Sequence, residues 1–303
     1  MTSIQPTVGV WRNLNIAVVG GDEREQEICR LAAGTGAAVR AFGFPWPDAG
    51  IKLVTFAADA AAALAGAHIA LFPIPGIAND GSLFATEKIT PRQAMLSVMA
   101  PRAHIILGKA DPGLLAAANS LAIEIHEYET DHELMLLRAP AIVEAALKVI
   151  IENTAITIHG AQICVIGQGN IGSVLTRTLI ALGAKLTVAA RNPVQRALAY
   201  TMGANSVTLD ALLPIAHSFD VILATAPAAV VNAEMIDRLA LHALIIDLTA
   251  PPGSCDLDYA RSTGRKAIWA RALGRRAPIT VGGSQWVGIS KIIEAIIARK
   301  DGQ

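Results

Sequence analysis

The stretch ICVIGQGNIGSVLTRTLIALGA, residues 163–184, decides the fold of this chain. An apolar run of strand length leads into a glycine-rich turn, and the turn opens a helical pattern. Gly167, Gly169 and Gly172 have the full G-x-G-x-x-G spacing. In such a turn the first glycine permits the tight bend, the second lets the backbone approach a pyrophosphate, and the third lets helix and strand pack closely. The stretch predicts a Rossmann domain that binds a dinucleotide, with a ligand-free packing turn as the alternative.

Residues of this turn and of the neighbouring strand ends are expected to hold the cofactor. Phosphate oxygens would lie at the helix N-terminus, where unpaired N–H groups and the positive end of the helix dipole favour an anion. The cofactor-binding residues that we predict are Gly167, Gly169, Asn170, Ile171, Gly172, Arg191, Asn192, Arg196, Thr225, Ala226, Pro227, Asp247 and Thr249.

The next expected strand indicates which dinucleotide binds. An NAD site usually has Asp or Glu at the end of this strand, where the carboxylate holds the ribose hydroxyls. Here the strand ends VAARN, residues 188–192, without a carboxylate. Arg191 can pair with a 2′-phosphate, and Arg196 can assist from the following helix. The sequence therefore favours NADP(H), and a solvated loop arginine is the alternative.

A second strand–turn–helix pattern, IAVVGGDEREQEICRLA, occupies residues 16–32. It has Gly20 and Gly21 but lacks the third glycine, and three carboxylates crowd the start of its helix. Such carboxylates would repel a phosphate, and Asp22 is better explained as the helix N-cap. We expect this turn to face a small polar substrate instead, with Gly21 among the substrate-binding residues.

Apolar runs of strand length alternate with helical patterns along both halves of the chain. The expected strands are residues 15–21, 37–44, 67–75, 103–110 and 123–129, and then 162–167, 185–192, 220–227, 243–253 and 266–271. Strands that alternate with helices imply parallel pairing and right-handed crossovers. We therefore predict an α/β fold of two tandem doubly wound, Rossmann-like domains with parallel sheets, joined by a long helix.

The domain boundaries follow from the same pattern. Residues 1–130 would form a flavodoxin- or Rossmann-like substrate-side domain, residues 131–153 a linking helix, and residues 154–282 the NADP-binding Rossmann domain. Residues 283–303 would form a carboxyl-terminal helix, with Ser284 as its N-cap, that returns towards the first domain. In the linking helix, Pro140 fits the first turn and Glu144 lies near the positive end.

Composition narrows the class of protein. The 303 residues carry a formal net charge of zero and are 53% hydrophobic. This charge does not support binding to nucleic acid or an anionic membrane. We expect a cytoplasmic protein, because no export signal or membrane-spanning run is visible. The three cysteines are too scattered for a disulfide framework. His126 and His132 flank an acidic run at a spacing that matches no common metal site, so we predict no metal.

Hydride transfer needs a group that exchanges a proton, and an acidic substrate needs cationic partners. Glu144 in the linking helix is the first catalytic candidate, with an electrostatic role at the helix end as the alternative, and Asp22 is the second. Lys109, Arg275 and Arg276 lie in expected strand-end loops and are candidates for binding substrate carboxylates. Exposed loop charges are the alternative for these three residues.

Several motifs resemble those of a family from spore-forming bacteria, that of the A subunit of dipicolinate synthase. They are the opening stretch at residues 16–32, TIHGAQICVIGQGNIG (157–172), LIALGAKLTVAARN (179–192), LIIDLTAPPGSCDLDYA (244–260) and APITVGG (277–283). The resemblance implies NADP-linked oxidation of a dihydrodipicolinate-level precursor to pyridine-2,6-dicarboxylate. It also implies that the partner protein is a dipicolinate synthase B subunit. In a spore-forming host it implies a place in the mother-cell cytoplasm during sporulation, and we further expect a homo-oligomer.

Departures from the family fall at strand ends. The family's Pro-Thr-Val-Glu-Gly run is APAIVEAA here, its Ser-Gly-Ile-Ser turn is LGKAD, its Arg-Pro-Gly-Gly is APPGS, and its Gly-Leu-Pro-Gly is ALGRR. An arginine that could hold a substrate carboxylate is thereby missing. Two alternatives therefore stay open: a related NAD(P)-dependent hydroxy- or imino-acid dehydrogenase, and a non-enzymatic NADPH-binding regulatory subunit.

Overall fold

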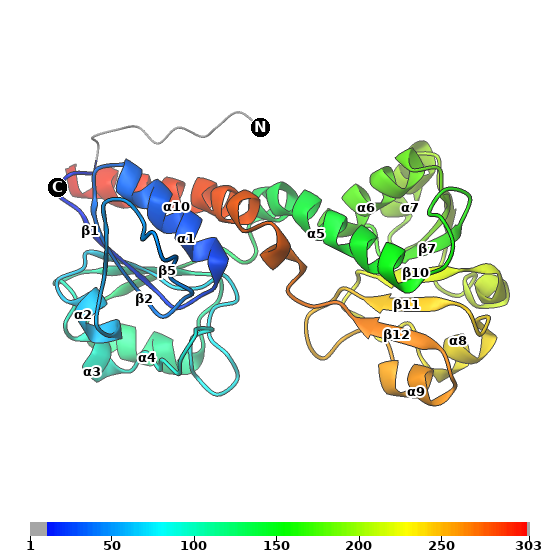
Figure 1. Cartoon of the computed structure of the whole chain (residues 1–303), viewed down its shortest axis with the longest axis horizontal. Coiled ribbons are helices and arrows are strands. Elements are labelled where there is room, and N and C mark those ends of the chain that lie inside the picture. Colours follow the sequence, from blue (N-terminus) through cyan, green and yellow to red (C-terminus); the bar gives the residue numbers. More distant parts are fainter. Residues whose placement is uncertain (1–10, 302–303) are drawn as a thin grey trace. The chain divides into compact units, whose positions relative to one another are not determined.

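The computed structural model describes residues 11–301 and divides the chain into two compact units. Unit 1 comprises the chain up to Arg138 together with the segment from Ala277 onward, and unit 2 comprises Ala139–Arg276. Each unit contains a six-stranded parallel sheet with helices between successive strands (Figure 1). The prediction of two doubly wound α/β domains is therefore confirmed.

The sheet of unit 1 has the strand order β3-β2-β1-β4-β5-β6. Its strands are β1 (Asn15–Val19), β2 (Ala38–Phe42), β3 (Val54–Phe56), β4 (Ile69–Leu71), β5 (His104–Leu107) and β6 (Glu124–Glu127). Its helices are α1 (Glu23–Gly34), α2 (Ala60–Leu64), α3 (Gln93–Leu96), α4 (Pro112–Ser120), the start of α5 (His132–Asn153) and α10 (Pro278–Asp301). The order reverses between β1 and β4, so the turn after β1 lies at the switch point where ligands bind in such sheets.

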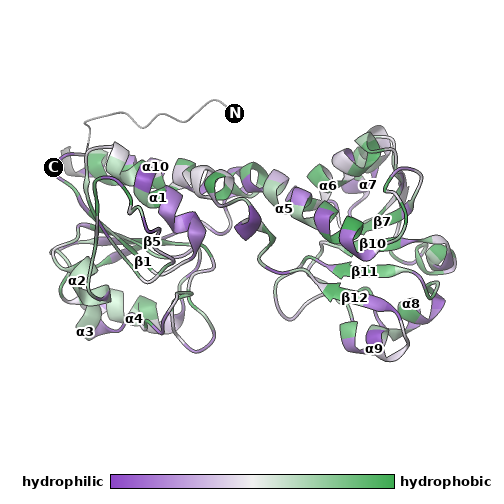
Figure 2. Ribbon diagram, in the orientation of Figure 1, coloured by the Kyte–Doolittle hydropathy of each residue, from purple (hydrophilic) through white to green (hydrophobic). Residues whose placement is uncertain are grey.

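The sheet of unit 2 repeats this topology with the order β12-β11-β10-β7-β8-β9. Its strands are β7 (Gln162–Ile166), β8 (Lys185–Ala189), β9 (Asn205–Val207), β10 (Val221–Ala224), β11 (Leu244–Asp247) and β12 (Lys266–Trp269). Its other elements are most of α5, then α6 (Asn170–Ala181), α7 (Pro193–Thr201), η1 (Leu213–Ser218), α8 (Ala233–Arg238), α9 (Leu257–Ser262) and η2 (Leu273–Arg276). Figure 2 shows β11 largely in green because Leu244, Ile245 and Ile246 are apolar, and every residue of β10 and β11 is buried, Asp247 included.

Each sheet has one edge strand that the sequence pattern did not predict. β3 and β9 are three residues long, and none of their residues is fully buried. Three residues are too few for an apolar alternation to be detected, and these strands join their sheets through backbone hydrogen bonds. They complete the edges of the sheets, and Val207 of β9 also packs against the core of unit 2.

The linking helix places Pro140 and Glu144 differently from the sequence prediction. The Asp131 carboxylate accepts hydrogen bonds from the backbone N–H groups of Glu133 and Leu134, and α5 starts at His132. Pro140 is therefore inside the helix and not in its first turn, and Glu144 is remote from the positive helix end. The expectation that Glu144 serves as a partner of the helix dipole was wrong, because that effect is confined to the first turn.

The carboxyl-terminal helix also begins earlier, at Pro278, and Ser284 is not its N-cap. The Ser284 hydroxyl donates to the Val281 carbonyl inside the helix. Where α10 packs on α1, a Cβ on Gly282 would lie 2.6 Å from the Arg24 carbonyl oxygen, so this helix crossing needs a glycine. Trp286 is buried beside Trp11, with ring centroids 5.6 Å apart. The helix thereby belongs to the core of unit 1. No helix within residues 11–301 combines the length and the apolar character that crossing a membrane requires.

Helix α1 begins with a reciprocal capping arrangement. The Asp22 side chain accepts a hydrogen bond from the Arg24 N–H, and the Glu25 carboxylate accepts one from the Asp22 N–H at 2.7 Å. This arrangement satisfies backbone donors that a helix N-terminus leaves unpaired. Glu25 is 2% exposed. Burial disfavours its charged form and raises the pKa of Glu25 from the usual 4.5 to about 7.

Replacing Glu25 by Gln should remove a pH-dependent part of the stability of unit 1. A group whose pKa is higher in the folded state than in the unfolded state adds to the free energy of unfolding. This addition is complete below the unfolded-state pKa and is lost as pH rises through the folded-state pKa. Between pH 4.5 and pH 7 the wild type should therefore lose on the order of 3 kcal/mol of unfolding free energy that Glu25→Gln does not lose. Urea unfolding followed by tryptophan fluorescence measures this loss, because Trp11, Trp46 and Trp286 all lie in unit 1.

Glu87→Gln is the matched control, since Glu87 is an exposed carboxylate of the same unit. That variant should retain the wild-type decline. An equal decline in the wild type and in Glu25→Gln would contradict the assignment of this pH dependence to Glu25.

Candidate functional site

Each of the three glycines in the glycine turn of unit 2 has its own structural role. Gly167 has φ +100°, and a Cβ there would lie 2.7 Å from the Thr225 hydroxyl oxygen. A Cβ on Gly172 would collide with the Gly167 carbonyl oxygen, so this glycine allows α6 to pack against the turn. A Cβ on Gly169 would meet no atom within 4 Å. Open space therefore lies at the N-terminus of α6, where Gly169 is the N-cap without a side-chain capping bond. This cradle fits a pyrophosphate.

A pocket with an empty volume of about 510 Å³ adjoins this turn. Its lining includes Gly167 at the turn, Ala190, Arg191 and Asn192 after β8, Leu209 after β9, and Ala226 after β10. Among the described residues that line it, none is acidic. Arg191 thus lies where an NAD-preferring domain has the carboxylate that binds the ribose hydroxyls. Which dinucleotide this pocket binds stays a prediction.

Other residues predicted to bind the cofactor have contacts of their own in the structure. The Arg196 guanidinium donates from Nη1 to the carbonyl oxygens of Ala190 and Arg191, at 2.8 and 2.7 Å, so it holds the loop that carries Arg191. The Asn192 side chain caps α7, and the Thr225 hydroxyl donates to the Ile166 and Gly167 carbonyls. These side chains shape the pocket walls. Their direct contacts with a cofactor stay predictions.

Asp247 is fully buried and organises the loop after β11. Its carboxylate accepts hydrogen bonds from the Thr249 N–H and hydroxyl at 2.8 and 2.6 Å, and from the N–H groups of Ser254 and Cys255 at 2.6 and 3.0 Å. Burial alone would raise the pKa of Asp247, but these hydrogen bonds outweigh burial and lower it. Asp247 and Thr249 therefore bind one another, and any contact with a cofactor stays a prediction.

The turn of unit 1 is filled by a side chain of its own helix. A Cβ on Gly21 would collide with the Glu25 carboxyl group, which occupies the space at the N-terminus of α1. Asp22 is the N-cap, as predicted, and its two carboxylate oxygens accept a fork of hydrogen bonds from Arg24, each 2.7 Å long. A phosphate would meet both carboxylates here. The described geometry therefore agrees with the expectation that this turn holds no dinucleotide.

A buried polar cluster that the sequence did not reveal lies around this turn. We call Arg24, Glu25, Tyr128, Arg138 and Gln285 the unit 1 polar cluster. Gln285 is 1% exposed and donates from Nε2 to the Tyr128 hydroxyl oxygen at 3.2 Å. Tyr128 interacts electrostatically with Glu25, Arg138 and Arg24, and burial is the main cause that raises its pKa. Burial likewise lowers the pKa of Arg138.

Three atoms of the unit 1 polar cluster lack hydrogen-bond partners. In the described part of the chain the buried side-chain atoms without a partner are Glu25 Oε1, Arg138 Nε and Gln285 Oε1. Buried polar atoms are nearly always satisfied by protein, water or ligand. The turn after β1 and Tyr128 after β6 both lie at the carboxyl ends of parallel strands, where ligands bind in such sheets. The cluster therefore has the features of a site for a polar ligand.

The residues predicted to bind substrate are distributed over both units. Lys109 is exposed in unit 1, whereas Arg275 and Arg276 lie in η2 of unit 2. Arg276 forms an ion pair with Glu144, whose side chain is 63% exposed. This ion pair was not anticipated, because the two residues are far apart in the sequence. The substrate-binding role of Lys109, Arg275 and Arg276, and the catalytic role of Glu144 and Asp22, stay predictions.

One signal in the sequence could have revealed part of the unit 1 polar cluster. Gln285 precedes Ile289 and Ile293 at helical spacing, so it is a polar residue on the apolar face of the carboxyl-terminal helix. A buried amide needs partners, which makes such a position a candidate for a ligand site. Arg138 gave no comparable signal, because it lies among exposed and apolar residues at the start of a long helix.

Comparison with known proteins gives matches to both units. The family model for the N-terminal domain of the dipicolinate synthase A subunit matches residues 15–129. The model described as Shikimate / quinate 5-dehydrogenase matches residues 149–256. A domain of this second type implies a nicotinamide cofactor, so the chain is of a dehydrogenase-like, oxidoreductase type.

Individual relatives match along the whole chain. The A subunit of dipicolinate synthase from Bacillus subtilis (strain 168) is 28% identical over 294 residues, which are 95% of this chain and 98% of that protein. The crystal structure of the same subunit from Bacillus halodurans has a TM-score of 0.85 at 26% identity and covers 94% of this chain and 98% of its own. A transhydrogenase from Sinorhizobium meliloti shares the fold at 15% identity, with a TM-score of 0.67 over 92% of this chain and 94% of its own. The chain is thus similar to the A subunit of dipicolinate synthase over nearly its whole length.

Proposed function

We propose that this protein is an NADP-dependent oxidoreductase that oxidises a dihydrodipicolinate-level precursor to pyridine-2,6-dicarboxylate. The observation that carries the proposal is the combination of an open phosphate cradle at Gly169 with a pocket that contains Arg191 and no acidic residue among the described residues that line it. The family supports the substrate. The oxidation removes a hydride and a proton from the dihydropyridine ring, and bound NADP⁺ supplies the hydride acceptor.

The residues of the chain divide this work between the two units. In unit 2, the N-terminus of α6 binds the pyrophosphate and Arg191 binds the 2′-phosphate. In unit 1, we assign the recognition of a substrate carboxylate to Arg24 and Arg138 of the unit 1 polar cluster. Arg138 Nε lacks a partner, and Arg24 already orients its guanidinium on Asp22. Lys109, Arg275 and Arg276 remain further candidates for binding carboxylates.

Glu144 remains the proposed proton acceptor, and Asp22 is the second candidate. Glu144 forms an ion pair with Arg276, which holds its carboxylate in a defined position beside a cation. A dipicolinate synthase B subunit is the proposed partner protein, following the family name. We also propose a homo-oligomer.

A turnover assay distinguishes this function from its alternatives. The dihydrodipicolinate-level precursor is supplied with NADP⁺, and NADPH absorbance is followed with and without a B subunit. Formation of NADPH together with pyridine-2,6-dicarboxylate supports the proposal. NADPH binding without turnover in either condition supports a regulatory role, and turnover of hydroxy or imino acids alone supports the related dehydrogenase.

Gly169→Val should abolish dinucleotide binding while the apo protein stays folded. The Cβ of the new side chain would enter space that no protein atom occupies, and the loss of stability should be no more than about 1 kcal/mol, as expected when a poor N-cap residue replaces glycine. The same side chain would prevent the backbone from approaching a pyrophosphate. Calorimetric titration with NADPH and thermal unfolding of the apo protein measure the two effects. Gly172→Val is the contrasting variant and should unfold at a lower temperature, because its side chain collides with the Gly167 carbonyl.

Arg191→Ala should weaken NADP(H) binding by about 1.5–3 kcal/mol, the range for hydrogen bonds to charged groups, and should leave NAD(H) binding almost unchanged. Dissociation constants for both cofactors give the comparison. Arg238→Ala, at an exposed arginine in α8 of the same unit, is the control and should change neither constant. Equal losses for NADP(H) and NAD(H) in Arg191→Ala would remove the argument for NADP.

Arg138→Gln should weaken binding of the dicarboxylate product and raise KM for the substrate, while the Kd for NADPH stays at its wild-type value. The loss of a charge-assisted hydrogen bond predicts an effect of about 1.5–3 kcal/mol. Thermal unfolding with added pyridine-2,6-dicarboxylate tests binding without turnover. Arg138→Lys should recover part of the affinity, and Arg30→Gln, at an exposed arginine of α1, should behave as wild type. Unchanged product affinity in Arg138→Gln would exclude Arg138 from the substrate site.

A further inference from the structure

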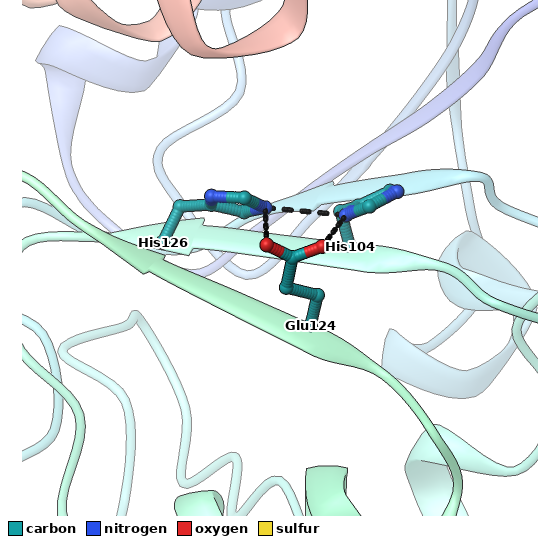
Figure 3. A group of neighbouring side chains, drawn as sticks. All are labelled: His104, Glu124 and His126. Carbon is teal, nitrogen blue, oxygen red and sulfur yellow. Dashed lines mark hydrogen bonds and ion pairs between the residues drawn. The ribbon is translucent and has the colours of Figure 1, made fainter. Parts of the chain in front are cut away.

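Two histidines and a glutamate meet at the amino-terminal edge of the unit 1 sheet. His104 is the first residue of β5, and Glu124 and His126 are the first and third residues of β6. In the parallel register His104 pairs with Glu124, and Ile106 pairs with His126. Residues two apart on a strand face the same side, so all three side chains project from one face of the sheet. Figure 3 shows their polar ends directed at one another.

The separations of their ligand atoms match those around a single metal ion. His104 Nδ1 and His126 Nε2 are 3.1 Å apart. Glu124 Oε2 lies 3.5 Å from His104 Nδ1, and Glu124 Oε1 lies 3.8 Å from His126 Nε2. Bonds of about 2.0–2.1 Å from zinc to nitrogen or oxygen place tetrahedral ligands roughly 3.4 Å apart. An ion can therefore enter between the three groups with small side-chain movements.

The chemistry of these groups also suits a metal ion. The side chains of His104 and His126 are 12% and 17% exposed, so their rings are held in place while Glu124, at 51%, faces solvent. A neutral imidazole is the form that binds metal. Two imidazoles and one carboxylate are a common zinc ligand set that leaves one position for water.

The ion pair that Glu124 forms with Arg299 competes only weakly with a metal ion for the Glu124 carboxylate. Arg299 of α10 approaches Glu124 Oε1 at 3.4 Å, and the Arg299 side chain is 69% exposed. Exposed pairs of this kind contribute about 0–1 kcal/mol. Arg299 can therefore move aside when a doubly charged ion binds.

We propose that His104, Glu124 and His126 bind a divalent transition-metal ion, with zinc as the best fit, at a site separate from the unit 1 polar cluster. The polar cluster lies at the carboxyl ends of the strands, and the histidines lie near the amino ends. The ion would tie the edge strand β6 to β5 and stabilise the fold of unit 1. The sequence did not predict this site, because its ligands come from two strands and the local spacing around His126 points to His132 instead.

Cobalt binding to the full-length, untagged protein tests this proposal. The protein is freed of metal with a chelator and titrated with Co²⁺ alone, and Zn²⁺ is then added as a competitor. We expect a single Co²⁺ per chain, with visible absorption typical of a low-coordinate site that Zn²⁺ removes. His104→Ala, His126→Ala and Glu124→Gln should each weaken binding by at least about tenfold. His132→Ala, at an exposed histidine of the same unit, is the matched control and should bind as wild type.

A second measurement keeps the test decisive if a histidine variant folds poorly. Zn²⁺ should raise the thermal midpoint of the wild type and of His132→Ala, and should leave the midpoint of Glu124→Gln, a change at a half-exposed side chain, nearly unaltered. Binding that survives all three substitutions overturns the proposal. Binding that is lost only on Cys255→Ser also overturns it, as does the absence of saturable Co²⁺ binding to the wild type.

Discussion

The N-terminus of the helix that follows the first strand of each sheet determines what each unit can bind. Both helices begin at the switch point of the same strand order, and both direct their N-terminus to the carboxyl edge of the sheet. In unit 2 this position is open at Gly169, whereas in unit 1 the Glu25 carboxylate occupies it. One fold therefore gives an anion-binding cradle in one unit and a self-capped turn in the other.

Filling the turn of unit 1 has consequences for the surrounding residues. The Glu25 carboxyl group is buried, and its pKa rises to about 7. Asp22 and Arg24 pair beside it, and Tyr128, Arg138 and Gln285 complete a polar environment within an otherwise apolar unit. Burying so many polar groups is costly unless they are hydrogen-bonded, and the three unpaired atoms show that the protein alone does not satisfy them. Ordered water or a polar ligand would satisfy these atoms.

The sequence predicted the elements that depend on local patterns. The glycine spacing, the apolar strands and the Asp22 cap were all readable, because each is determined by residues within one turn or strand. The placement of Pro140 in the first turn of α5 was wrong, since Asp131 caps a helix whose first turns lack a continuous apolar face. The Glu144–Arg276 pair, the unit 1 polar cluster and the histidine pair all join residues that are distant in the sequence. Such contacts are properties of the fold and leave no local pattern.

The contacts within the loop after β11 help to explain one of the departures from the family motifs at strand ends. The APPGS sequence lacks the arginine of the family that it resembles, and Asp247 accepts five hydrogen bonds from Thr249, Ser254 and Cys255 of this loop. The buried carboxylate thus gives the loop a defined shape, and the APPGS sequence itself supplies no positive charge. A dicarboxylate would still need cations, because an unpaired carboxylate is costly to bury. In unit 1, Arg138 retains an unused donor. We therefore attribute to the unit 1 polar cluster the electrostatic role that the loop after β11 no longer has.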